Sequence, residues 1–234
     1  MYNNKDLHGL SMRARAILRL NNLGNSTKPS PNLYPHQWNW DSAFIAVGLS
    51  HSDPPRAQME IKSMLNAQWK TGMIPHIVFN PEAVNYHPGP EYWESQISDA
   101  PATIRTSGIT QPPVLAEAAL EIYLNASDKD EALTFLHDTY PALVQETHFF
   151  REHRDPGNEG LAFICHPWES GMDNSPIWDD PLNKFKMSFK PEFMRKDNTT
   201  IPADQRPSDE EYNRYSYLVQ RYGQEQWDQS KIAE

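Results

Sequence analysis

The sequence predicts an all-α protein with the hairpin architecture of an (α/α) toroid, and three observations support this fold class. Apolar residues recur at helical spacing in most segments, whereas the alternation typical of strands is almost absent. The predicted helices come in pairs joined by short turns, and long loops separate the pairs. The 20 prolines punctuate those loops and keep them out of regular structure. Inner helices of such a ring line a central pocket.

Three helices are predicted in the first part of the chain. The first presents five apolar residues on one face: Leu7, Leu10, Ala14, Ile17 and Leu18. The second is expected over 40–51 with Asp41 as its N-cap. The third is expected over 53–69 with Asp53 as its N-cap. Its predicted apolar stripe consists of Ala57, Ile61, Met64 and Leu65.

A long break over 71–111, rich in proline, glycine and aromatic residues, separates these helices from four more. The next helix shows apolar periodicity over 114–123. Ser127 is expected to start the following helix, in which Leu133 and Leu136 face inward, and Pro141 is expected to start another. Ser208 predicts the N-terminus of the last helix. A loop of about forty residues in a compact domain is normally functional.

Composition restricts the class of protein. We expect one domain, residues 1–234, without an internal boundary. The net charge of −10 argues against nucleic acid and anionic membrane surfaces as partners, because both require a basic face. The single cysteine, Cys165, excludes an intrachain disulfide. The N-terminus lacks the apolar run of a secretory signal and no segment has the length of a membrane span, so a cytoplasmic protein is expected.

The densest cluster of chemical groups is the stretch HPWESGMDNSPIWDD, residues 166–180. Its glycine and proline keep it out of a regular element, so its side chains can converge on one point. Asp173 lies between Gly171–Met172 and Asn174–Ser175. A carboxyl held beside tryptophan and proline is partly desolvated, which raises its pKa and suits a general acid. A solvated loop rich in turn-forming residues explains the same composition equally well.

A second candidate is NLYPHQWNWDSAFIA, residues 32–46. Its aromatic residues offer flat apolar faces, and the polar residues between them offer hydrogen-bond donors and acceptors. A sugar has the same dual character, with C–H faces and with hydroxyls that must be hydrogen-bonded when they are desolvated. The alternative is that Trp38 and Trp40, on one side of an extended chain, belong to the core.

Two further positions are weighed in the loops. Gln111 precedes two prolines at a helix start and is placed to point into a cavity, although a plain capping region is the alternative. His76 can contact a substrate or act as a hydrogen-bonded structural histidine, and its sequence context favours the second. A glycine-rich phosphate loop, a GxSxG elbow and an HExxH motif are absent from the sequence, and no metal site is predicted.

Four stretches in this order carry a family resemblance: YPHQWNWDSAFIA, GMIPHIVF, TSGITQPP and HPWESGMDNSPIWDD. Together they resemble the six-hairpin α/α-toroid glycosidases of glycoside hydrolase family 63, especially the bacterial branch that includes mannosylglycerate hydrolase. The ESGxD motif is more distantly similar to that of trehalases. The resemblance covers roughly residues 30–225 and implies an inverting hydrolase of a small α-glucoside or α-mannoside that needs no cofactor.

The resemblance also implies roles for particular residues. Asp173 would be the general acid. The residues expected to bind the substrate are Tyr34, His36, Gln37, Trp38, Trp40, Asp41, Gln111, Trp168, Glu169 and Asn174. In the family the catalytic base is a glutamate from the second half of the toroid, and this chain is expected to hold only about the first half. The isolated chain is therefore predicted to be poorly active, and self-association through the open half-ring is expected.

Two alternatives to an active glycosidase remain at this point. The chain can be a non-catalytic carbohydrate-binding remnant that retains the aromatic pocket, or a helical scaffold whose loops bind a protein partner. The first alternative keeps a sugar-dependent change in tryptophan fluorescence, whereas the second predicts none.

Overall fold

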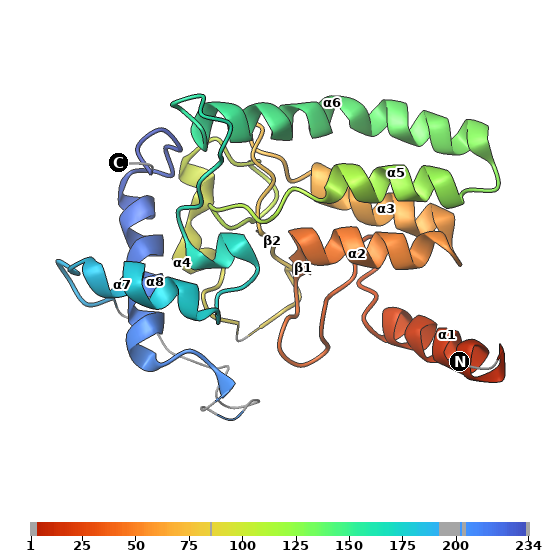
Figure 1. The fold of residues 1–234 in the computed structure, drawn as a ribbon, viewed down its shortest axis with the longest axis horizontal. Helices are drawn as coiled ribbons and strands as arrows, with labels where there is room; N and C mark the ends of the chain where they lie inside the picture. Colours follow the sequence, from red (N-terminus) through yellow and green to blue (C-terminus); the bar gives the residue numbers. More distant parts are fainter. Residues whose placement is uncertain (1–3, 85, 192–201, 203–204, 233–234) are drawn as a thin grey trace.

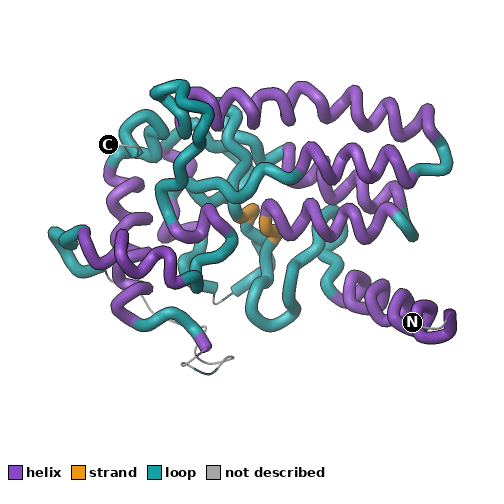
Figure 2. The backbone as a smooth tube through the Cα atoms, viewed as in Figure 1, coloured by secondary structure: helices purple, strands orange, loops and turns teal. Residues whose placement is uncertain are grey.

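The computed structural model describes residues 4–84, 86–191, 202 and 205–232, which form a mostly helical molecule (Figures 1 and 2). The α-helices are α1 (Asn4–Leu20), α2 (Asn39–Ser50), α3 (Pro54–Leu65), α4 (Pro90–Trp93), α5 (Leu115–Asn125), α6 (Lys129–His153), α7 (Asp179–Lys184) and α8 (Asp209–Gln224). Three short 3-10 helices are η1 (Ser95–Ile97), η2 (Pro167–Ser170) and η3 (Pro176–Trp178). The strands β1 (Gln37–Trp38) and β2 (Ile77–Val78) form one antiparallel pair.

One half of the molecule is a stack of the helices α2, α3, α5 and α6 (Figure 1). Its core is rich in small residues such as Ala43, Ala46, Ala118 and Ala119, which let the helices approach closely. The predicted stripe of α3 is confirmed, because Ala57, Ile61, Met64 and Leu65 are all buried in this core.

The other half is built around aromatic residues. Trp69, Trp93, Phe149, Tyr222 and Trp227 are buried together and bring loop segments, α4, α6 and α8 into one core. The indoles of Trp93 and Trp227 lie 5.3 Å apart, and Trp227 Nε1 donates to the Trp93 carbonyl at 2.9 Å. The β1–β2 pair lies between the two halves (Figure 2), so the residues around it are anchored from both sides.

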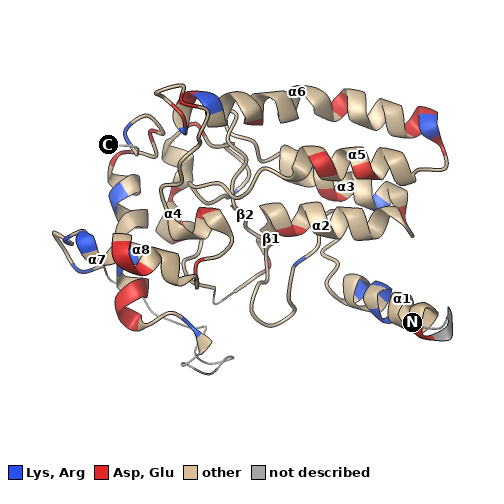
Figure 3. Ribbon diagram, in the orientation of Figure 1, with Lys and Arg blue, Asp and Glu red and all other residues tan. Residues whose placement is uncertain are grey.

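The helix α1 stands apart from the stack (Figure 1). Of its predicted apolar face, Leu18 packs against the α2–α3–α5 core, whereas Leu7, Leu10 and Ile17 are exposed. The helix also carries a concentration of arginines in a chain that is acidic as a whole (Figure 3). The helical periodicity therefore predicted the element, but not the exposure of its apolar face.

Two of the predicted N-caps are confirmed. The Asp53 side chain accepts from Arg56 N at the start of α3. Ser208 forms a capping box with Glu211 at the start of α8, in which each side chain accepts from the backbone of the other residue.

Two other predicted helix starts are wrong. The helix α2 begins at Asn39, so Asp41 lies in its first turn and does not cap it. An acidic side chain there is still favourable, because it faces the positive end of the helix dipole. The helix α6 is capped by Asp128 rather than started by Ser127, because the Asp128 carboxylate accepts from two backbone N–H groups of the first turn.

The predicted boundary at Pro141 is also wrong. The segment from Lys129 to His153 is one continuous helix with Pro141 inside it. Proline removes one helical hydrogen bond and crowds the preceding turn, but packing of α6 against α3 and α5 outweighs this cost. Of the two leucines expected to face inward in the first part of this helix, Leu136 packs against the core, whereas Leu133 is exposed and Phe135 is buried instead. No described helix combines the length and the apolar character needed to cross a lipid bilayer.

Candidate active site

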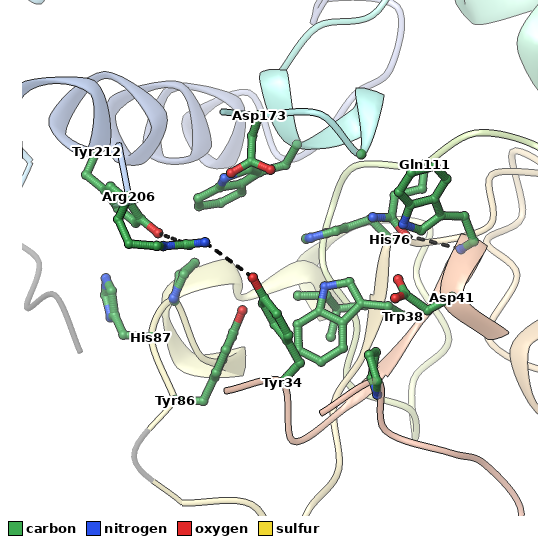
Figure 4. Close-up of a pocket in the computed structure, with 16 residues that line it drawn as sticks. Tyr34, Trp38, Asp41, His76, Tyr86, His87, Gln111, Asp173, Arg206 and Tyr212 are labelled. Carbon is green, nitrogen blue, oxygen red and sulfur yellow. Dashed lines mark hydrogen bonds between the residues drawn. The ribbon is translucent and has the colours of Figure 1, made fainter. Parts of the chain in front are cut away.

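A cavity of about 240 Å³ lies between the two halves of the molecule, next to β1 and the start of α2 (Figure 4). Sixteen residues from segments far apart in the sequence line it: Pro29, Tyr34, Trp38, Trp40, Asp41, His76, Ile77, Tyr86, His87, Pro88, Gln111, Trp168, Gly171, Asp173, Arg206 and Tyr212. Seven of the eleven predicted site residues are among them. They are Tyr34, Trp38, Trp40, Asp41, Gln111, Trp168 and Asp173.

The segment around β1 builds an aromatic wall of the cavity. Trp38 pairs with Ile77 of β2 in the antiparallel register, which fixes its side chain against the core. Its indole makes edge contacts with the rings of Tyr34 at 5.1 Å and Tyr86 at 5.7 Å. Trp38 is buried in the core and also lines the cavity, so the two interpretations of this residue do not exclude each other.

The first turn of α2 supplies the second wall. The backbone N–H of Trp40 donates to Gln111 Oε1 at 3.3 Å, so the Gln111 amide is oriented by the start of this helix (Figure 4). Burial raises the pKa of Asp41 to about 6, although hydrogen bonds from its own backbone and from Trp40 act in the opposite direction. Asp41 therefore carries a carboxyl that is sensitive to pH near neutrality inside the cavity.

His76 contributes a neutral imidazole to the same wall. Its Nδ1 lies 2.9 Å from Ser107 Oγ, and its ring stacks near Trp168 at 6.1 Å. Burial lowers the pKa of His76 well below its ordinary value, with smaller contributions from His166 and His36. The ring is therefore uncharged at neutral pH and offers hydrogen bonds without a charge. His76 is both hydrogen-bonded within the fold and part of the cavity wall.

Asp173 enters the cavity from the irregular segment after η2 (Figure 4). Gly171 ends η2 in the left-handed region with φ +67°, which turns the chain so that Asp173 follows on the cavity side. The Tyr215 hydroxyl on α8 donates to the Asp173 carbonyl at 2.9 Å and holds its backbone. Burial raises the pKa of Asp173, while its own backbone N–H and nearby Arg206 lower it to a smaller extent.

The end of the cavity near α8 contains a cation that sequence reasoning did not find. Arg206 donates to the Tyr212 hydroxyl at 3.0 Å and to the Tyr34 hydroxyl at 3.5 Å (Figure 4). Tyr86 and His87 line the same end. The flanking stretch IPADQRP has no recognisable motif, and an arginine near prolines signals nothing by itself. The packing of α8 against α4, which follows Tyr86 and His87, helps to bring these residues together.

Four of the residues expected to bind substrate do not line this cavity. His36 and Gln37 are buried on the far side of the aromatic wall and border a different, larger hollow of about 720 Å³. The Gln37 amide donates to Ser42 and to Glu60, so its hydrogen-bonding capacity is used inside the fold. Asn174 is exposed and is not part of the lining.

Glu169 is the fourth, and its environment is that of a buried ion pair. It is 2% exposed, and its Oε1 accepts from Arg154 Nη2 at 3.0 Å and from Thr110 N at 3.2 Å. Its Oε2 accepts from Cys165 N at 2.8 Å. Both oxygens of this carboxylate have a partner within the protein, so the side chain braces the cavity wall from behind.

No group of three or more histidine, cysteine, aspartate or glutamate side chains with a metal-binding arrangement occurs in the described part of the chain. The cavity instead combines two carboxyls of raised pKa, a neutral imidazole, aromatic faces and one guanidinium. This set can hold a polyhydroxylated molecule and transfer a proton to it.

Residues 34–234 match the family described as the mannosylglycerate hydrolase MGH1-like glycoside hydrolase domain. The chain belongs to this family. Its similarity to the mannosylglycerate hydrolase of Rubrobacter radiotolerans is 42% identity over 228 residues, which cover 96% of this chain and 52% of the relative. It is also 41% identical to the glucosylglycerate hydrolase of Mycolicibacterium hassiacum, with 95% of this chain and 52% of that protein covered.

Solved structures of the family confirm the predicted fold. The crystal structure of the family 63 mannosylglycerate hydrolase from Thermus thermophilus in complex with Tris and D-glycerate matches with a TM-score of 0.89 at 38% identity. The match covers 96% of this chain and 52% of that one. A structure of the same enzyme in complex with glucose matches with a TM-score of 0.81. The resemblance to glycoside hydrolase family 63 is thus confirmed, and this member spans about half the length of the relatives it matches.

Proposed function

We propose that this family member forms the acid-bearing half of a glycosidase that hydrolyses a hexose linked to a small carboxylic acid such as glycerate. The observation that carries the proposal is the position of Asp173, a carboxyl of raised pKa, in a cavity with hydroxyl-binding groups and a guanidinium. A protonated carboxyl there can donate to the oxygen of the bond that is broken.

The two ends of the cavity differ in chemistry, and this difference supports the substrate class. Asp41, His76 and Gln111 lie together, where they can accept from and donate to sugar hydroxyls (Figure 4). Arg206 and its tyrosine partners lie at the other end, where a guanidinium can bind a carboxylate in a bidentate manner. Asp173 lies between these two ends in the close-up, as the link between a sugar and an acid would require.

The relatives are named for substrates of this kind, and the Thermus enzyme has been crystallised with D-glycerate and with glucose. A chain with a net charge of −10 repels anions at long range, so a carboxylate-bearing substrate needs a local cation. Arg206, in the cavity lining, supplies it.

The reaction we propose is single-step inversion. Asp173 gives its proton to the glycosidic oxygen as the bond from that oxygen to the anomeric carbon breaks. A water attacks the opposite face of the anomeric carbon, and a second carboxylate takes the proton that the water loses. Inverting enzymes place the two carboxyls about 6.5–9.5 Å apart to accommodate the water. We assign the base to polypeptide outside this chain, and Asp41 to sugar binding.

A direct test is the titration of Asp173 by carbon NMR of the carboxyl, with Asp173→Asn to assign the resonance. We expect a pKa clearly above the ordinary value of about 3.9 for aspartate. A carboxyl that stays ionised down to its ordinary range cannot act as the acid, and that result would refute the proposal. We also expect no hydrolysis of mannosylglycerate or glucosylglycerate by the isolated chain, and turnover would refute the placement of the base.

A further inference from the structure

The Glu169 side chain joins two stretches of backbone that build the cavity. Its Oε1 accepts from Thr110 N at 3.2 Å, next to the cavity residue Gln111. Its Oε2 accepts from Cys165 N at 2.8 Å, where the segment with Trp168 and Asp173 begins. The spacing between the cavity residues Gln111 and Trp168 therefore depends on this carboxylate.

Arg154 holds Glu169 in place at the end of α6. Its Nη2 donates to Glu169 Oε1 at 3.0 Å and to Gln229 Oε1 at 2.9 Å. Its guanidinium lies over the Phe149 ring at 4.9 Å, and both charged side chains are fully enclosed. Gln229 in turn donates to the Gly108 carbonyl at 3.4 Å, so the network returns to the stretch that carries Gln111.

Stability alone does not account for such a pair. Removing two charges from water costs several kcal/mol per ion, and apolar side chains of similar volume often stabilise a core as well or better. A charged pair differs from apolar packing in that its hydrogen bonds have fixed lengths and directions. The arrangement therefore points to precise placement of the backbone segments that it joins, and both of these segments carry cavity residues.

We propose that Glu169, oriented by Arg154, is a positioning residue that sets the spacing between Gln111 and Trp168 and thereby controls hexose binding. This inference rests on the proposed function of the cavity. The side-chain hydrogen bonds of Glu169 and Arg154 go to the 108–111 stretch, the 165–169 stretch, His153 and Gln229. Within the described residues none of them reaches Arg206 or Tyr34, so the carboxylate-binding end of the cavity is independent of the pair.

The test compares two ligands on the same protein. Tryptophan fluorescence is titrated with D-glucose and, separately, with D-glycerate, for the natural chain and for Glu169→Gln. The amide turns an NH2 group toward one of the N–H groups that donated to the carboxylate, so the backbone segments that Glu169 joins must shift. We expect the Kd for glucose to rise about tenfold, which corresponds to about 1.4 kcal/mol, while the Kd for glycerate changes less than twofold.

A matched control is Glu146→Gln, since Glu146 is another buried glutamate, on α6 and outside the cavity lining. It is expected to leave both affinities unchanged. Glu169→Asp keeps the charge but withdraws the carboxylate by one methylene, and it gives a second reading if Glu169→Gln does not fold. An equal loss of affinity for both ligands, or a lower melting temperature with unchanged affinity for glucose, would overturn the positioning role. Failure of the natural chain to bind either ligand would refute the proposed function instead.

Discussion

Gly171→Ala is expected to disturb the cavity through a single added methyl group. Gly171 has φ +67°, a backbone conformation that costs a residue with a side chain roughly 1–2 kcal/mol. A Cβ at this position would lie 2.5 Å from Trp40 Cζ2 and 2.8 Å from Cε2 and Cη2. Carbon atoms in contact are normally about 3.5–4.0 Å apart, so the indole must move by roughly 1 Å.

Two costs then add. Overpacking of this kind typically costs about 1–3 kcal/mol, and with the backbone term the free energy of unfolding should fall by about 2–5 kcal/mol. Because Trp40 lines the cavity next to Gln111, its displacement should also weaken hexose binding by about tenfold, or 1.4 kcal/mol. Urea unfolding and glucose titration, both followed by tryptophan fluorescence, measure the two effects.

Gly160 offers a matched control, because it has the same backbone type with φ +80° but nothing within 4 Å of an added Cβ. Gly160→Ala should therefore cost only about 1–2 kcal/mol of unfolding free energy and leave glucose binding unchanged. If Gly171→Ala and Gly160→Ala proved equal in stability and in glucose affinity, the contact with Trp40 would not shape the cavity, and the reasoning would be wrong.

Two further predictions concern ionisable side chains. Burial raises the pKa of Glu146 to about 7, so between pH 4.5 and 7 the folded state binds a proton that the unfolded state has lost. The free energy of unfolding should therefore fall by about 3 kcal/mol as the pH rises from about 4.5 to 7. Glu146→Gln should remove that part of the pH dependence in thermal melts, and an unchanged pH profile would contradict the prediction. Arg206→Met should abolish D-glycerate binding in fluorescence titrations, whereas the Kd for glucose should stay within about threefold of its original value. The reason is that Arg206 lies at the opposite end of the cavity from Gln111. Retained glycerate binding would exclude Arg206 as the carboxylate site.

Features that depend on neighbours in sequence were predictable. The caps at Asp53 and Ser208 are read from two or three adjacent positions, and the structure contains both. The boundary predicted at Pro141 failed because the local cost of proline competes with packing of α6 against other helices, which the local sequence does not report. The local sequence likewise does not report that most of the apolar face of α1 is exposed.

The candidate site shows a similar division. Trp38, Trp40 and Asp173 lie in dense aromatic and acidic stretches, and the cavity contains all three. Glu169 lies in the same stretch as Asp173 but faces Arg154, because a short 3-10 helix turns its side chain inward. Composition cannot distinguish a carboxylate that meets a ligand from one that meets a buried arginine. Arg206 was missed because its surroundings depend on the fold: Tyr212 is only six residues away, but Tyr34 is 172 residues away in the sequence.

The position of Arg206 also links binding to the protonation of Asp173. Before a substrate binds, burial raises the pKa of Asp173, and the nearby guanidinium of Arg206 opposes that effect. A substrate carboxylate paired with Arg206 would cancel much of this positive charge and would displace water. Both changes raise the pKa of Asp173 further, so the acid would be most firmly protonated when the glycosidic oxygen is in place. A neutral sugar would displace water but could not cancel the positive charge of Arg206, so in the proposed reaction recognition of the anionic group would contribute to catalysis as well as to affinity.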